Sequence, residues 1–182
     1  MKTKLSVYHL CLIAFAIVLN LVGAQIALLL HLPIYLDSIG TCFIAAVLGP
    51  FYALLPGLLS ALINGMLGDM YAFYYAPVTL LLGILYGYGW KYCTKQKGQL
   101  LLAALFITIP TSLLSACITA YLFGGITSSG STLLVQLLAH TPLGLTVSCF
   151  IVQFITDYID RLLTLVLVKH LAFRILKRST KL

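Results

Sequence analysis

Three charged residues near the end of the chain are the most reactive group in the sequence. Asp157, Asp160 and Arg161 lie inside a long apolar run. Asp157 and Arg161 are four residues apart, so a helix places them on one face, where they can form an ion pair. The two aspartates can also share a proton, as paired catalytic acids do. Buried charges in a bilayer indicate function or a structural contact. A structural or subunit-interface role and a ligand contact are therefore both open for this group.

A second group of polar and aromatic residues gathers between residues 37 and 75. Aromatic rings stack on planar ligands, and hydroxyl, amide and carboxylate groups orient them, so such a group is typical of a binding pocket. The predicted pocket residues are Asp37, Thr41, Asn64, Asp69, Tyr71, Tyr74 and Tyr75, with His140 as a further candidate. The alternative is an interfacial belt of tyrosines, with Asp37 as the cap of the helix that follows it.

Catalytic and metal-binding motifs are absent from the sequence. The four histidines and five cysteines have no metal-ligand spacing. The chain contains no glutamate, which excludes a His-Glu-x-x-His motif, and it has no Walker motif. We therefore expect no enzymatic activity and no cofactor, and any ATP-driven work would need a separate subunit. The alternatives are an intramembrane enzyme that uses Asp157 and Asp160, and a stand-alone small-molecule carrier.

The composition places these groups in a membrane protein. Hydrophobic residues make up 62% of the chain and charged residues 8%, so the apolar side chains must use lipid as solvent. All the lysines and all but one arginine lie in residues 1–4, in residues 91–97 and from Lys169 onward. Such basic clusters stay on the cytoplasmic side and contact lipid headgroups, so the net charge of +7 does not indicate nucleic-acid binding.

The apolar runs between these clusters predict the helices. The stretch 39–67 is interrupted at Gly49-Pro50, where proline removes a helical hydrogen bond. Two helices here keep all three basic clusters on one side of the membrane, which is the less costly arrangement. We therefore predict an all-α integral membrane protein, a single domain over residues 1–182, with six transmembrane helices and both termini cytoplasmic. The predicted helices are 8–30, 39–48, 50–67, 72–90, 99–123 and 142–168.

The helix predicted at 39–48 is too short to cross the bilayer. It spans about 15 Å, roughly half the hydrocarbon thickness. Interrupted helices at membrane depth are tolerated where they border a cavity. We therefore expect a ligand cavity that opens to the extracellular side.

Several short stretches resemble the substrate-binding S components of energy-coupling factor (ECF) transporters. The most specific is Leu36-Asp37-Ser38-Ile39-Gly40-Thr41 with the Gly-Pro that follows it. The similar stretches are Leu36–Thr41, Ala45–Pro50, Tyr74–Pro77, Phe123–Gly125, Ser129–Ser131 and Asp157–Arg161. The resemblance implies a six-helix subunit of the bacterial cell membrane that captures a water-soluble vitamin. Its partners would be a transmembrane coupling subunit and two ATPase subunits.

The resemblance also implies a docking surface and a class of vitamin. Small residues at four-residue spacing let helices approach closely in lipid. In the first helix Ala14, Ala16, Asn20 and Ala24 are approximate substitutes for the family's docking patch for the coupling subunit. The outer half of the membrane region has no lysine or arginine to bind a carboxylate. Vitamins without an exposed carboxylate are therefore favoured. Among them the overall resemblance implies cobalamin, with riboflavin, pyridoxine or another B-type vitamin as alternatives.

Overall fold

The chain folds as an all-α protein. The computed structural model describes residues 6–93 and 99–179, and every regular element in these two ranges is an α-helix. The helices are α1 (Val7–Leu29), α2 (Ile39–Val47), α3 (Pro50–Met66), α4 (Tyr71–Tyr74), α5 (Ala76–Cys93), α6 (Gln99–Phe123), α7 (Ser131–Ala139) and α8 (Gly144–Ser179). Among them, α1 and α6 are by themselves long and apolar enough to cross a membrane.

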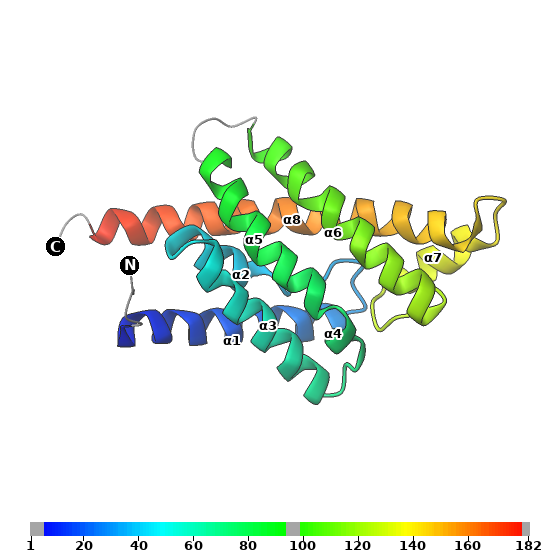
Figure 1. The fold of residues 1–182 in the computed structure, drawn as a ribbon, viewed down its shortest axis with the longest axis horizontal. Coiled ribbons are helices and arrows are strands. Elements are labelled where there is room, and N and C mark those ends of the chain that lie inside the picture. The colour runs from blue at the N-terminus through cyan, green and yellow to red at the C-terminus, as the bar shows by residue number, and fades with distance from the viewer. Residues whose placement is uncertain (1–5, 94–98, 180–182) are drawn as a thin grey trace.

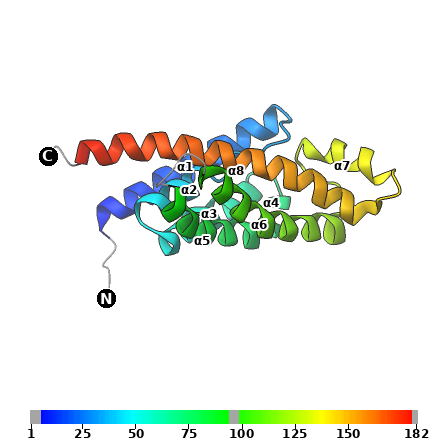
Figure 2. The same ribbon diagram turned by 90° about the horizontal axis from the view of Figure 1, so that it is seen from above.

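The long helices form a bundle in which α1 begins and α8 ends at the same end of the molecule (Figure 1, Figure 2). The helix α7 and the last turns of α6 lie at the other end. The helices α3, α5 and α6 run side by side and cross the directions of α1 and α8. Most residues of the three basic clusters, including Lys2, Lys4, Lys95 and Lys97, lie outside the described residues or where only the backbone is described.

The nine-residue helix α2 lies at the centre of the bundle. It packs against α1, α3, α5 and α8, and its residues from Gly40 to Ala45 are all buried. An asparagine of α1 caps its N-terminus: Asn20 Oδ1 accepts from the Gly40 N–H at 2.7 Å, and Asn20 Nδ2 donates to Thr41 Oγ1 at 2.8 Å. Neither Asp37 nor any other residue of the preceding loop caps α2 with a side-chain bond. The cap is needed because open helix ends away from water must find protein partners.

The break between α2 and α3 falls at Gly49-Pro50. Gly49 has a φ of 99°, which glycine tolerates because it has no β-carbon. Pro50 is the first residue of α3, where the missing N–H leaves no intrahelical bond unmade. The chain therefore reverses here, and α2 keeps only about half the length of a membrane span.

The structure differs from the predicted helices in three places. The predicted helix 72–90 is divided at Tyr75 into α4 and α5, because Pro77 has no N–H with which to bond the Phe73 carbonyl. A short apolar segment before His140, which lies outside all six predicted helices, forms the separate helix α7. The last helix begins at Gly144 and continues to Ser179, well beyond the predicted end at 168.

The small residues of α1 face the interior of the same chain. Ala16, Asn20 and Ala24 are buried, and α1 packs on α2 and α3. Large apolar residues cover the opposite face and are exposed, as expected for contact with lipid. The predicted docking residues Ala16, Asn20 and Ala24 thus hold helices of this chain together, and only Ala14 is exposed.

This close packing predicts the effect of adding one methyl group. A β-carbon at Gly40 would lie 2.0 Å from the Ala16 carbonyl oxygen, so the backbone of α1 or α2 would have to move. We expect Gly40→Ala to lower the free energy of unfolding by about 1–3 kcal/mol, and thermal unfolding of the detergent-solubilised protein measures the loss.

The matched control is Gly89→Ala in α5. Its β-carbon would meet only the tip of the Ile107 side chain, at 3.1 Å, and that side chain can give way. Equal unfolding midpoints for the two variants would contradict the close α1–α2 contact.

Candidate ligand-binding site

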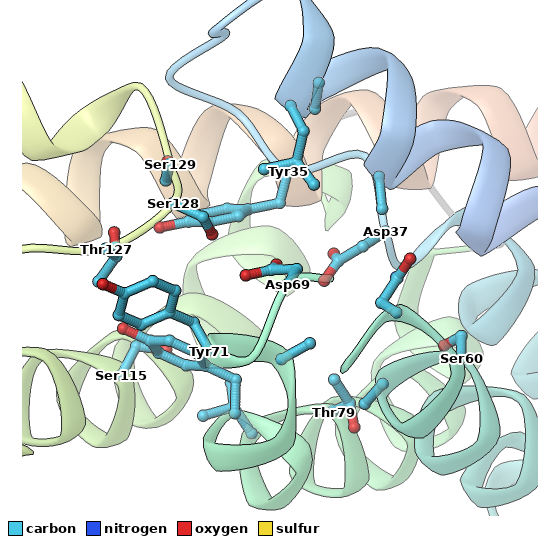
Figure 3. A pocket seen from close by; sticks show the side chains of 18 of the residues that line it. Tyr35, Asp37, Ser60, Asp69, Tyr71, Thr79, Ser115, Thr127, Ser128 and Ser129 are labelled. Carbon is cyan, nitrogen blue, oxygen red and sulfur yellow. The ribbon is translucent and has the colours of Figure 1, made fainter. Parts of the chain in front are cut away.

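A pocket with a volume of about 90 Å³ opens among α1, α3, α4, α5, α6 and α8 (Figure 3). The segments that connect α1 to α2, α3 to α4 and α6 to α7 complete its lining. That volume holds several water molecules or one small organic molecule. Its walls combine apolar side chains of α1 and α5, such as Ala24, Leu28 and Leu82, with hydroxyl, amide and carboxylate groups. A cavity of this mixed lining is typical of a site for a small polar ligand.

The loop between α1 and α2, residues 30–38, closes one side of the pocket. Its backbone is anchored on α8, where the Leu36 N–H donates to Asp160 Oδ1 at 2.9 Å. Leu36 has a φ of 52°, which is unfavourable for a residue with a β-carbon, so the surrounding contacts must hold it. The turn before α7 packs on the same loop, since a β-carbon at Gly130 would lie 2.1 Å from the His31 carbonyl oxygen. The loop thereby connects Asp160 of α8 with the turn before α7.

A cluster of buried charged residues on α8 borders the pocket, and two of them, Asp157 and Arg161, line it. Arg161 Nη1 contacts Asp160 Oδ2 and lies 3.3 Å from Ser38 Oγ, and Arg161 Nη2 lies 3.7 Å from Asp157 Oδ1. Ser112 Oγ of α6 donates to Asp157 Oδ2 at 2.9 Å. The three charged residues are only 0–3% exposed. Arg161 Nε has no hydrogen-bond partner among the described residues. With one arginine and two aspartates, the cluster carries more negative than positive groups.

Two further aspartates turn into the same cavity. Asp37 comes from the loop 30–38 and Asp69 from the turn after α3, and Figure 3 shows both near the middle of the pocket. In each of them Oδ1 is buried and has no hydrogen-bond partner in the described part of the chain. Asp37 lies outside the spanning helices, and its burial raises the pKa of the carboxyl to about 6, against the opposing effect of Arg161.

An aromatic group borders the pocket on the side of α4 and α6. The rings of Tyr71, Tyr74 and Tyr75 all approach Phe123, with centroid distances of 4.8, 5.2 and 6.3 Å. The Tyr75 hydroxyl is hydrogen-bonded to Thr119 Oγ1. The contacts of Tyr71 and Tyr74 are edge-to-face, an arrangement that adds to the stabilisation from apolar burial.

The structure brings together five of the eight predicted binding residues. Those that line the pocket are Asp37, Asn64, Asp69, Tyr71 and Tyr75. Thr41, Tyr74 and His140 do not line it. Thr41 bonds to Asn20 in the packed interior, Tyr74 is half exposed against Phe123, and His140 is an exposed residue at the end of α7.

Sequence reasoning missed several pocket residues. These are Tyr35, Ser60, Thr79, Ser115, Thr127, Ser128 and Ser129. Serine and threonine are common in membrane spans, so their presence alone does not indicate a site. Whether such a residue faces the pocket depends on the rotation of its helix about the helix axis, which the sequence did not reveal. Asp157 and Arg161 were recognised as a charged pair, and the structure places both of them at the pocket.

A comparison with protein families identifies the kind of domain. The family model described as "5TMR of 5TMR-LYT" matches residues 1–160. This family is the membrane sensor domain of LytS-type histidine kinases and implies about five transmembrane helices. Comparisons with curated proteins and with solved structures give no match.

The family match overturns the transporter interpretation. The ECF S component, the vitamin ligand, the coupling subunit and the two ATPase subunits were wrong predictions. The physical reason is visible at Gly40 and Thr41 in the stretch that resembled that family most. Gly40 permits close approach to α1 and Thr41 bonds to Asn20, so these residues satisfy helix packing. The location in a membrane as a multi-pass protein is confirmed. Since the match covers 160 of 182 residues, this chain belongs to the 5TMR-LYT family.

Proposed function

We propose that this chain is a signal-sensing membrane domain that acts on a LytS-type histidine kinase module. Its pocket would receive the signal and α8 would transmit it. The observation that carries the proposal is that Asp157 and Arg161 line the pocket and belong to a helix that continues without a break to Ser179. Family membership supports the sensing role. In this proposal the chain itself has no enzymatic activity.

The link between the pocket and α8 is the loop 30–38. A ligand in the pocket touches Asp37 on this loop and the charged residues of α8 at the same time. The hydrogen bond from the Leu36 N–H to Asp160 is the direct connection between the two elements. A ligand shifts α8 only if it binds more tightly to one loop position than to another. We propose that the two positions are the loop bonded to Asp160 and the loop released from it.

We further propose six membrane segments, namely α1, α2, α3, α5, α6 and α8, with both ends of the chain on the cytoplasmic side. The positions of the first turn of α1 and the last turn of α8 support this arrangement (Figure 1). The helix α2 has only nine residues, about half a span, and without it these segments number five, as the family implies.

Substituted-cysteine labelling tests this topology in a variant whose native cysteines have been replaced. We expect Gln96→Cys and Thr180→Cys to be labelled by a membrane-impermeant maleimide in inverted vesicles and to be protected in intact cells. Ile126→Cys, in the loop between α6 and α7, should behave in the opposite way. Labelling of positions 96 and 180 from different sides would exclude the proposed topology.

The sensing proposal is tested by the phosphorylation of the LytS-type kinase in cells that carry this chain. Asp160→Asn keeps an oxygen acceptor for the Leu36 N–H but removes the charge that faces Arg161. We expect the phosphorylated fraction of the kinase to change at least about fivefold, the lower end of typical coupling between sites. Quantitative immunoblotting of membranes checks that the variant is present at the normal level.

The matched control is Thr164→Val, at a position on α8 beyond the cluster. Thr164 is fully buried and its hydroxyl has no partner among the described residues, so the isosteric change should leave phosphorylation unaltered. If removal of the whole chain leaves kinase phosphorylation unchanged, the sensing role is refuted.

A further inference from the structure

We propose that the pocket binds a small organic cation, an amine that also carries an acceptor oxygen, with Asp37 and Asp69 as its anionic partners. The inference names the ligand class of the site and rests on the proposed function only for its role in signalling.

The first argument is the balance of charge. The charged residues that line the pocket are Asp37, Asp69, Asp157 and Arg161. Arg161 forms ion pairs with Asp157 and Asp160 and also attracts Asp37, so the described residues at this site supply one positive group for four aspartates. Buried charges need a partner because desolvation is costly. A cation between Asp37 and Asp69 supplies it, whereas an anion would add to the negative excess.

The second argument comes from polar atoms that lack partners. Oδ1 of Asp37 and Oδ1 of Asp69 are buried and accept no hydrogen bond in the described residues, so they require donors. Arg161 Nε also lacks a partner, and this side chain is only 3% exposed at the pocket. A guanidinium N–H requires an acceptor. A primary ammonium group supplies donors to the two carboxylate oxygens, and a nearby hydroxyl or carbonyl oxygen accepts from Arg161 Nε, whereas a quaternary amine supplies the charge and only its hydroxyl as a donor.

The third argument is the aromatic lining. Tyr35 from the loop and Tyr71 from α4 both border the cavity that holds the two aspartates (Figure 3). Aromatic faces attract ammonium groups and form the walls of many quaternary-amine sites. A metal ion fits less well, because the described residues contain no group of three or more side chains suited to hold one.

Equilibrium binding to the purified full chain tests the ligand class. The probes are choline and ethanolamine, a quaternary and a primary amine that each carry a hydroxyl group. The controls are 3,3-dimethylbutan-1-ol, the neutral isostere of choline, and acetate. We expect at least one of the two amines to bind at least about tenfold more tightly than the neutral isostere, and acetate to bind no better than the isostere. If neither amine exceeds the isostere, the proposed ligand class is wrong.

Two variants assign the binding to the aspartates. Asp37→Asn and Asp69→Asn should each weaken amine binding by at least about tenfold, because each leaves a single carboxylate for the cation. His140→Gln, an exposed change outside the pocket, is the matched control and should bind as the unaltered chain does. Equal affinity in all three variants would place the amine elsewhere and overturn the proposal.

Choline keeps its charge at every pH, so the pH dependence of its binding reports on the protein. Burial raises the pKa of Asp37 to about 6, and a protonated carboxyl no longer attracts a cation. Binding should therefore weaken several-fold from about pH 7.5 to about pH 5.5, and less so in Asp37→Asn. The charged and titratable groups around Asp37 are Tyr35, Asp69, Asp157, Asp160 and Arg161. Equal affinity at both pH values would contradict a charged Asp37 partner.

The outcomes separate this inference from the sensing proposal. Binding of an amine without any effect on the kinase refutes only the sensing role. Control of the kinase by this chain without amine binding refutes only the ligand class. A proton shared by Asp37 and Asp69 in place of a cation would appear as pH-dependent stability that no amine alters, and that result also overturns the inference.

Discussion

The charges on α8 are the constraint to which the surrounding structure responds. An arginine and two aspartates inside an apolar helix are costly unless polar groups of other elements reach them. The loop 30–38 supplies the Leu36 N–H to Asp160 and the Ser38 hydroxyl to Arg161, and α6 supplies the Ser112 hydroxyl to Asp157. Segments far apart in the sequence therefore meet at one point of α8, and the pocket lies directly beside it.

The short length of α2 makes these contacts with α8 possible. A full-length second span would carry the loop 30–38 to the membrane surface, away from the middle of α8. Because α2 has only nine residues, the loop enters the bundle and its Leu36 reaches Asp160. The cost is an open helix N-terminus inside the protein, and Asn20 removes that cost by bonding the Gly40 N–H. One asparagine among small residues on α1 thus supports the geometry of the pocket.

Much of the helical layout could be predicted from the sequence, because its signals are local. The Gly49-Pro50 pair defines the boundary between α2 and α3, and the apolar run at 99–123 has the bounds of α6. The division at Tyr75 was missed because the Pro77 nearby is tolerated in the first turn of a new helix.

The pocket was only partly predictable, because its lining depends on which sides of several helices face one another. The loop residue Tyr35 and hydroxyl residues such as Ser60 gave no distinctive local pattern. Thr41 was assigned to a ligand although its hydroxyl serves Asn20. The ECF interpretation also depended on short local stretches of sequence. Glycine and threonine occur in unrelated membrane proteins because they permit close helix packing, so their presence in such a stretch does not identify a family.

The contacts of Asp160 also determine how the newly made protein must assemble. The ribosome completes the last helix only after all the others, yet the groups that make its charges acceptable to lipid belong to the first third of the chain and to α6. The charges of α8 must therefore find their partners on segments that have already been made. A chain truncated before α8 would keep Asn20 and α2 but would lack Asp160, the acceptor for the Leu36 N–H.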